Sequence, residues 1–386
     1  MLIAVIGGNL QGVEVTYLAQ KAGFQVLLID KNSQVPACGL CDQFVQANIL
    51  NDPEITSHLE KCDVIFPAFE NEAGLTRLSQ ICQQINKPFL IDLSAYAISS
   101  SKLASDQLFS DLKLPQPLLW PSCDFPVVVK PSEGSGSDGV KILGSQPEAQ
   151  QTYGNVFPPT GYVIQQYIEG PAYSIEIMGA TGNYHTFQIT ELGIDRLYDC
   201  KRVTAPVVLP GSLVQEFESL ATTVAEALQL NGIMDVEVIL HENQLKILEI
   251  DARFPSQTPI TVYWSTGKNM VQEMVNLFLE KQFPTVSKKI TEKHVIFEHI
   301  SVNKDQIEVQ GEHIMCLDHP LHLEKNFFGA DEGITDYQAG KREWVATLIM
   351  AADTEAELKN KKMKVINTIK QHQKIHKVID LDPTTN

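Results

Sequence analysis

The sequence lacks several features that would assign it to whole classes of protein. No run of eighteen apolar residues occurs, so we predict no membrane-spanning segment. The start, residues 1–8, has no basic region and no cleavage site, so it does not resemble a signal peptide. Cysteine is sparse and irregularly spaced, with 7 in 386 residues, which excludes a disulfide framework and fits reduced thiols in the cytoplasm.

Basic residues are also scarce. The chain has 30 Lys and Arg against 47 Asp and Glu, a net charge of −17. Neutralising phosphates requires a surplus of Lys and Arg, so we expect no nucleic-acid partner. The charge is compatible with Mg²⁺ and with cationic substrates, and equally with simple solubility.

The length predicts two or three domains of an α/β protein. In residues 1–93, apolar strands at 2–6, 25–29, 64–67 and 89–91 alternate with helices at 11–22 and 73–85. Such alternation predicts a Rossmann-like parallel sheet covered by helices.

Residues 94–285 form the second predicted unit. We expect helices at 97–109 and 213–228, and strands at 125–130, 140–143, 162–166, 172–178, 184–189, 232–240 and 244–250. Asn243 is expected in a hairpin turn between the last two strands. In residues 286–386, strands at 293–301 and 342–351 and a helix at 354–375 predict a small α+β domain.

A glycine loop, Gly7-Gly8-Asn9-Leu10-Gln11-Gly12, lies between the first strand and the first helix. Backbone N–H groups at a helix start favour an anion. Asp30 ends the second strand, where dinucleotide folds place a ribose-binding acid, but Asn9 replaces the middle glycine of that fingerprint. A small-molecule site, a structural turn and an NAD site all remain open.

Lysine and glycine come together in the second unit. The buried strand 125–130 ends at Lys130 and is followed by a Gly/Ser loop, 131–139, which contains Ser135. Such a loop can fold over phosphates and donate backbone N–H bonds, or it can be a flexible hairpin. It is not a P-loop, because the lysine precedes the glycines.

Acidic residues mark the strand pair 232–250. Glu237 and Glu249 are twelve residues apart, which suits neighbours across a hairpin, and Glu249 and Asp251 share one strand face. Three carboxylates among apolar residues favour a hard divalent cation such as Mg²⁺. Arg253 would add a cation for a phosphoryl oxygen or an oxyanion. A solvated acidic face is the alternative.

The order of Lys102, Lys130 with its glycine loop, the linker 163–170 and Glu-x-Asp-x-Arg resembles the ATP-grasp superfamily over residues 94–285. Within it, the chain is most similar to the 3-methylornithine–lysine ligases of pyrrolysine biosynthesis. The stretches that carry this likeness are 8–12, 28–32, 198–200, 232–237 and above all 250–259, Ile-Asp-Ala-Arg-Phe-Pro-Ser-Gln-Thr-Pro. The resemblance implies an ATP-grasp fold with the parallel-sheet domain before it.

The resemblance also implies roles for individual residues. ATP would bind at Lys102, Lys130, Ser135, Gln165, Gln166, Ile168 and Glu249, and Mg²⁺ at Glu237, Glu249 and Asp251. The amino-acid substrates would bind at Leu10, Gln11, Asp30, Glu70, Ser174, Glu176, Asp199, Arg253, Ser256 and Gln257, with lysine near Leu10, Gln11 and Glu70. Arg253 and Lys130 would be catalytic. Many members have Glu in place of Gln165 and Asn in place of Asp251.

The implied reaction joins the carboxylate of (3R)-3-methyl-D-ornithine to the ε-amine of L-lysine through an acyl phosphate, mostly by positioning and electrostatics. The expected partners are these small molecules, and a homodimer is possible. The alternatives are another ATP-grasp amino-acid, dipeptide or purine-pathway ligase, an NAD-dependent oxidoreductase, and a non-catalytic amino-acid sensor. Cys38-x-x-Cys41 and the group His313, Cys316, His319 and His322 are interpreted as structural thiols and a surface loop rather than metal sites.

Overall fold

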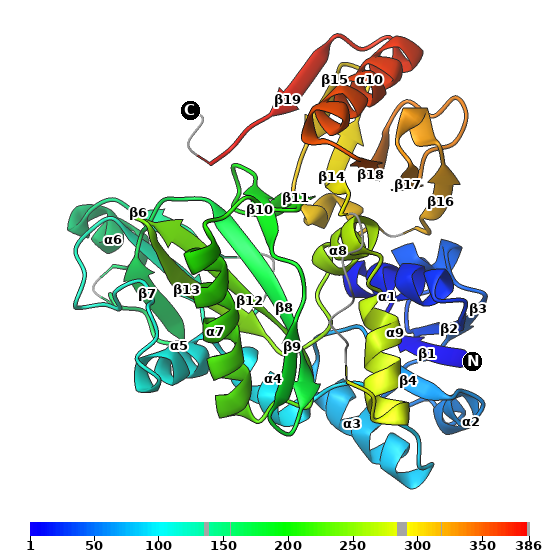
Figure 1. Cartoon of the computed structure of the whole chain (residues 1–386), viewed down its shortest axis with the longest axis horizontal. Helices are drawn as coiled ribbons and strands as arrows, with labels where there is room; N and C mark the ends of the chain where they lie inside the picture. Colours follow the sequence, from blue (N-terminus) through cyan, green and yellow to red (C-terminus); the bar gives the residue numbers. More distant parts are fainter. Residues whose placement is uncertain (135–138, 155, 284–291, 318, 384–386) are drawn as a thin grey trace.

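The computed structural model describes every residue except 135–138, 155, 284–291, 318 and 384–386. The described residues form three sheets: one of four strands, one of three and one of twelve. Figure 1 shows the N-terminal strands on one side, the three-stranded sheet on the other, and the large sheet between them.

The N-terminal part is the predicted parallel sheet with helices around it. Its strand order is β3-β2-β1-β4. The strands are β1 Leu2–Ile6, β2 Gln25–Asp30, β3 Gln43–Gln46 and β4 Val64–Pro67, and the helices are α1 Leu10–Lys21, α2 Ile55–Glu60 and α3 Glu72–Gln84, with a short turn η1 at Pro36–Gly39. The predicted strand at 89–91 is wrong. Only Phe89 forms a bridge, to Ile65, because the chain turns at Asp92 to cap the next helix.

The three-stranded sheet follows, in the order β6-β5-β7. Its strands are β5 Val127–Pro131, β6 Lys141–Leu143 and β7 Tyr162–Gln166, and the helices of this part are α4 Leu93–Ser99, α5 Lys102–Asp111 and α6 Gln146–Tyr153. The single helix predicted at 97–109 is wrong. Ser101 has an extended backbone and its hydroxyl accepts from the Ala104 N–H, so it ends one helix and caps the next.

The large sheet carries the acidic hairpin at one edge. Its main path is β13-β12-β8-β10-β11-β14-β18-β17-β16. Its first strands are β8 Ala172–Ala180, β9 Asn183–Thr186, β10 Thr190–Ile194, β11 Cys200–Ala205, β12 Gly232–His241 and β13 Gln244–Asp251; the accompanying helices are α7 Gly211–Leu228, α8 Thr258–Thr266, α9 Met270–Val275 and the π-turn η2 Asn276–Glu280. The strand predicted at 184–189 is shorter than expected. Asn243 lies in the hairpin turn, as predicted, with φ of +62°.

The C-terminal strands continue the same sheet, because β14 pairs antiparallel with β11. This part contains β14 His294–Val302, β15 Gln306–Val309, β16 His322–Lys325, β17 Glu332–Thr335, β18 Trp344–Ala352, β19 Lys377–Asp380, helix α10 Glu355–Gln373 and the turns η3 Glu312–Met315 and η4 Phe327–Gly329. The sheet is therefore continuous across the boundary predicted at residue 286. The division into 1–93, 94–285 and 286–386 stays a prediction.

Helix α1 joins the three parts of the chain. The Tyr17 hydroxyl donates to Glu332 at 2.6 Å and accepts from Trp264 Nε1 at 2.8 Å. The buried Glu14 carboxylate accepts from the Ile260 N–H at 2.7 Å, at the start of α8. These bonds connect the helix that follows the glycine loop to α8 and to β17.

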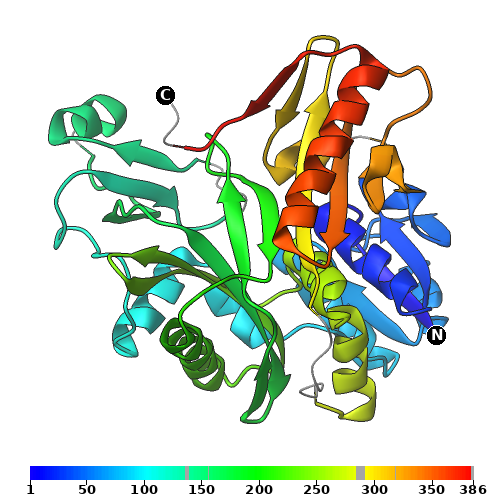
Figure 2. The same ribbon diagram turned by 45° about the horizontal axis from the view of Figure 1, so that its top comes forward.

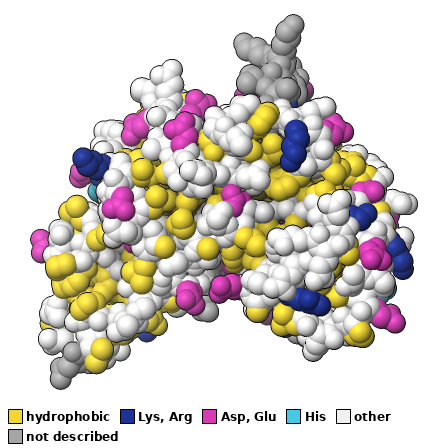
Figure 3. All heavy atoms as spheres, turned by 90° about the horizontal axis from the view of Figure 1, so that it is seen from below, with side chains coloured by type: hydrophobic (Ala, Val, Ile, Leu, Met, Phe, Trp, Pro, Cys, Tyr) yellow, Lys and Arg dark blue, Asp and Glu magenta, His cyan; other side chains and the backbone are white. Residues whose placement is uncertain are grey.

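Two surface observations bear on possible partners. In the described part of the chain, no helix is long and apolar enough to cross a membrane. Figure 3 shows one face, on which the Lys and Arg side chains are few and scattered. Among its described residues, that face has no basic patch of the kind that binds nucleic acid.

Candidate active site

Three adjoining cavities contain most of the predicted site residues. The lysine cavity, of 570 Å³, is lined by Lys102, Lys130 and Gln165, among others. The acidic cavity, of 150 Å³, shares Glu237 and Glu249 with it. The glycine-loop cavity, of 750 Å³, shares Arg253, Ser256 and Glu312 with the acidic cavity. The three therefore form a row from the three-stranded sheet to the N-terminal sheet.

The lysine cavity brings two cations to one carboxylate. Lys102 begins α5, and its Nζ lies 3.0 Å from Oε1 of Glu249 and donates to the Gly134 carbonyl at 2.7 Å. Lys130 is on β5, and burial lowers its pKa while Glu249 and Asp106 oppose that shift. Both lysines therefore face a shared space in which added negative charge would be stabilised.

Asp106 belongs to this cluster, although the sequence analysis missed it. Its two carboxylate oxygens accept from Gln165 Nε2 at 3.0 and 3.1 Å. Burial raises the pKa of Asp106 to about 6, against the opposing effect of Lys130. Asp106 follows Lys102 by four residues on one helix, so helical spacing could have identified it. Gln165 also lines this cavity with its amide facing Asp106, and its binding of ATP stays a prediction.

The other predicted members of the nucleotide set lie in the same place. Gln166 and Ile168 line the lysine cavity, together with the linker residues Glu169 and Gly170. Ser135 lies outside the described residues.

The acidic hairpin has the predicted register. Glu237 lies directly opposite Glu249, and Asp235 opposite Asp251. Burial and the nearby Glu249 raise the pKa of Glu237 to about 8. Burial likewise raises the pKa of Asp251 to about 7, against the pull of Arg253. In a protein without a bound cation, these groups therefore hold protons well above their usual range.

Arg253 links the hairpin to the N-terminal sheet. Its Nη2 lies 2.8 Å from Oδ2 of Asp251, and its Nε lies 2.8 Å from Oε1 of Glu70. Gln11 Nε2 donates to the same Glu70 oxygen at 2.8 Å. Burial alone would lower the pKa of Arg253, but Asp251 and Glu70 outweigh it and raise the pKa. The guanidinium is thus a fixed cation between two cavities.

The donor set suits a hard cation that is shared with a ligand. Among the described residues, no three His, Cys, Asp or Glu side chains gather closely enough to hold a metal ion by themselves. Glu237 and Glu249 offer carboxylate oxygens to a common cavity. Mg²⁺ typically takes one or two carboxylates and fills its remaining positions with phosphate oxygens and water. These residues therefore fit Mg²⁺ held together with a phosphate ligand; the third ligand, Asp251, stays a prediction.

Buried acceptors without partners mark the acidic cavity. Asp235 Oδ1 and Gln257 Oε1 line it, and neither has a hydrogen-bond partner among the described residues. The neighbouring Glu176 is fully buried, its Oε2 is likewise unsatisfied, and burial raises its pKa to about 7. Ser174 donates to its other oxygen at 3.4 Å. Leaving a buried acceptor unpaired costs about 1–3 kcal/mol, so this arrangement indicates a ligand that carries N–H donors.

The glycine-loop cavity is lined by Leu10, Gln11, Asp30 and Glu70, and their binding of an amino-acid substrate stays a prediction. The Asp30 carboxylate is occupied by the loop itself, because it accepts from the Gly8 and Asn32 N–H groups, both at 2.8 Å. Its first task is therefore to hold the loop. The loop also needs Gly12, where a Cβ would lie 2.2 Å from the Gly7 carbonyl oxygen.

The C-terminal part supplies residues that local patterns could not indicate. Glu312 lines both the acidic and the glycine-loop cavities and accepts from Ser256 Oγ at 2.8 Å.

Asp199, predicted from the resemblance, lines the acidic cavity and accepts from the His313 N–H. Asp235 was also missed, although it shares a strand face with Glu237 and the strand period of two predicts this.

The histidine group and the cysteines noted in the sequence form ion pairs and free thiols. The histidines at 313, 319 and 322 pair with three different carboxylates, those of Asp199, Asp336 and Glu324. All seven cysteines are free, and burial raises the thiol pKa of both Cys38 and Cys41. These thiols therefore lack the lowered pKa of a reactive cysteine.

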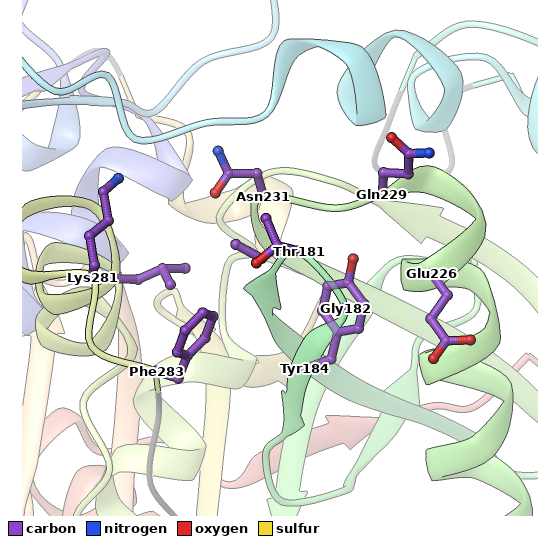
Figure 4. A pocket seen from close by; sticks show the side chains of 10 residues that line it. Thr181, Gly182, Tyr184, Glu226, Gln229, Asn231, Lys281 and Phe283 are labelled. Atoms are coloured by element: carbon purple, nitrogen blue, oxygen red, sulfur yellow. The ribbon is translucent and has the colours of Figure 1, made fainter.

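A separate cavity of 770 Å³ lies beside the β8–β9 hairpin. Figure 4 shows its lining, with Glu226 and Lys281 at opposite sides and Tyr184 between them. Glu226 and Lys281 do not point toward one another, so this cavity lacks the clustered charged side chains of the other three cavities.

Comparison with known proteins shows which family and which fold the chain resembles. An ATP-grasp domain family matches residues 99–257. The chain is 33% identical over 370 residues to the 3-methyl-D-ornithine–L-lysine ligase of Methanosarcina mazei, covering 95% of each chain. It is 33% identical over 366 residues to the same enzyme of Methanosarcina acetivorans, covering 93% of this chain and 95% of that one. The ADP complex of an N5-carboxyaminoimidazole ribonucleotide synthetase superposes with a TM-score of 0.70 at 14% identity, over 96% of this chain and 97% of that one. That likeness shows the fold.

Proposed function

The chain belongs to the family of 3-methyl-D-ornithine–L-lysine ligases, and we propose that it joins these two amino acids at the expense of ATP, in pyrrolysine biosynthesis. The observation that carries the proposal is the row of three cavities with Arg253 at its second junction. A reaction of three substrates needs three adjoining sites. Family membership favours this function over the oxidoreductase and sensor alternatives.

The lysine cavity suits ATP. Lys102 and Lys130 supply the positive charge that a triphosphate requires, and the linker at Gln166–Ile168 gives backbone groups beside an apolar wall. Mg²⁺ held by Glu237 and Glu249 would neutralise phosphate charge. Asp106, together with Gln165, offsets part of the lysine charge and keeps this cluster in place.

The acidic cavity suits the amino acid that is activated. 3-Methyl-D-ornithine carries two ammonium groups, which match the unpaired acceptors of Asp235 and Gln257 and the buried Glu176. Its carboxylate then faces the ATP side, where it attacks the γ-phosphorus and releases ADP. The product is an acyl phosphate, which must be kept from water.

The glycine-loop cavity suits lysine as the nucleophile. Its carboxylate fits the N–H groups at the start of α1, and its α-ammonium fits Glu70. The neutral ε-amine attacks the acyl carbon, the bond between that carbon and the phosphate oxygen breaks, and the departing phosphate takes up the proton that the nitrogen loses as the amide forms. Arg253, at the junction, would stabilise the oxyanion.

Product analysis tests the whole proposal. The purified protein is incubated with ATP, Mg²⁺, L-lysine and either 3-methyl-D-ornithine or D-ornithine, and products are identified by mass spectrometry. We expect one ADP and one phosphate for each amide, whose mass equals the two amino acids minus water. The proposal would be refuted if ATP were hydrolysed without either amino acid, or if no amide formed with either 3-methyl-D-ornithine or D-ornithine.

A second experiment tests the lysine site. Glu70→Gln should raise the lysine KM about 10-fold or more and leave the ATP KM nearly unchanged, because the ammonium partner is lost while Arg253 keeps its ion pair with Asp251. Slow ADP release without ligation is expected, since the acyl phosphate still forms. Glu72→Gln, at an exposed position two residues away, is the matched control. An unchanged lysine KM in Glu70→Gln would remove Glu70 from the site.

The cytoplasmic location and the homodimer stay predictions. Sedimentation of the purified protein at micromolar concentration distinguishes a monomer from a dimer.

A further inference from the structure

The C-terminal segment reaches the proposed ATP site from a distant part of the fold. Strand β19 pairs in parallel with β15 and ends at Asp380. The chain then continues to the lysine cavity, whose lining includes Asp382 and Pro383. Figures 1 and 2 show β19, in red, running from the end of α10 toward the strands β10 and β6.

A single buried lysine holds this segment. The side chain of Lys201, on β11, is fully buried. Its Nζ donates to Asp380 Oδ1 at 2.7 Å, to the Leu381 carbonyl at 2.8 Å and to Asp382 Oδ1 at 2.8 Å. An ammonium has three donors, and here all three acceptors come from three consecutive residues near the chain end.

The energetic consequence follows from burial. A buried ammonium is costly unless it is paired and hydrogen-bonded. The pairing of Lys201 is complete only while residues 380–382 are in place. The adjacent Arg202 strengthens the attachment, because it forms ion pairs with Asp380 and with Glu298.

The anchor point directly adjoins the site in the sequence. Lys201 directly follows Tyr198, Asp199 and Cys200, which line the acidic cavity, and Tyr198 also lines the lysine cavity. The C-terminal segment is therefore bound to the strand that leads out of the site. Its last described residues contribute to the cavity wall.

We propose that Lys201 is a positioning residue that latches segment 380–383 onto the central sheet, so that the segment forms one wall of the nucleoside-triphosphate site. The inference rests on the proposed function for the identity of the ligand. It predicts that the latch governs ATP binding and leaves both amino-acid sites unaffected.

Two variants test the latch. Lys201→Met removes the ammonium, and a chain that stops after Asp380 removes the wall but keeps all of β19. Both should raise the ATP KM and the Mg-ATP dissociation constant about 10-fold, while the KM values for both amino acids stay within about twofold. If Lys201→Met does not fold, the truncated chain carries the test, since the strand pairing of β19 is intact.

Lys361→Met is the matched control. Lys361 Nζ also donates to a carboxylate and a carbonyl, those of Asp331 and Ala351, but it lies on α10, away from the three cavities. It should lower stability without changing the ATP KM, which separates positioning from general destabilisation.

The outcomes are separable from the proposed function. Calorimetric titration of the full-length protein and of both variants with Mg-ATP measures the ATP dissociation constant without turnover. An unchanged or lowered ATP dissociation constant in the truncated chain would overturn the latch even if the full-length protein makes the amide. Absence of amide from the full-length protein would overturn the proposed function, and the binding measurement would still decide the latch.

Discussion

Replacing Glu237 by Gln should stabilise the metal-free protein at alkaline pH while abolishing its response to Mg²⁺. Glu237 lies opposite Glu249 on the hairpin, close to Asp235 and Asp251. Burial, and then the negative charge of Glu249, raise the pKa of Glu237 from 4.5 to about 8. The native protein without a cation therefore keeps a proton that the unfolded chain releases.

The sign and size of the effect follow from linkage. Below pH 4.5 both states are protonated and Glu237 contributes no difference. Between pH 4.5 and about 8 only the unfolded chain ionises, so the free energy of unfolding falls as pH rises. At 1.36 kcal/mol per pKa unit the loss is roughly 4 to 5 kcal/mol at most. Because Glu237 is half-buried beside an open cavity, screening reduces it to about 2 kcal/mol.

Thermal unfolding after removal of divalent ions measures this effect. About 2 kcal/mol corresponds to a Tm shift of about 2 to 3 °C for a chain of this length. Glu237→Gln should therefore unfold about 2 to 3 °C above the unchanged protein at pH 8 and at nearly the same temperature at pH 5. Added Mg²⁺ with ATP should raise the Tm of the unchanged protein and leave that of the variant almost unaltered.

Glu216→Gln, at an exposed position on α7, is the control and should show no pH-dependent difference. A gain in Glu237→Gln that is equal at pH 5 and pH 8, or no gain at pH 8, would show that the raised pKa of Glu237 does not govern the stability of the metal-free protein.

Other changes test the contacts around the site. Asp106→Asn removes the negative charge that Gln165 holds beside the lysines, so steady-state kinetics should show kcat reduced by about tenfold or more. Gly311→Ala would place a Cβ 2.1 Å from Oδ2 of Asp199 and displace that carboxylate, which lines the acidic cavity. The KM for the activated amino acid should therefore rise, with little change in the KM for ATP. Tyr17→Phe removes a hydrogen bond to the buried Glu332 and one to the partly buried Trp264, and should lower the free energy of unfolding in urea by about 1–3 kcal/mol. In each case, kinetics or unfolding equal to the unchanged protein would contradict the assigned contact.

Local patterns determined a large part of the fold. The alternation of apolar strands and amphipathic helices predicted the N-terminal parallel sheet, because side-chain periodicity follows directly from backbone geometry. The twelve-residue spacing of Glu237 and Glu249, with Asn243 in the turn, predicted their cross-strand pairing. The predictions of a strand at 89–91 and of a single helix at 97–109 were wrong. The side chains of Asp92 and Ser101 accept from backbone N–H groups and so start new helices at these positions.

The resemblance, rather than periodicity, predicted most of the candidate site residues, and the structure brings most of the described ones to three adjoining cavities; Glu176 lies buried beside them. Their individual roles in binding and catalysis stay predictions until the variants above are measured.

Tertiary structure alone decided the rest. The pairing of β14 with β11 makes the sheet continuous. The alternation of residues along a strand does not specify which other strand will pair with it. Glu312 reaches Ser256 across 56 residues, and Lys201 reaches Asp380 across 179. Such contacts depend on how whole elements pack, because no local spacing relates the two positions. The sequence by itself therefore determined the elements and the acidic hairpin, whereas packing decided which distant side chains complete the cavities.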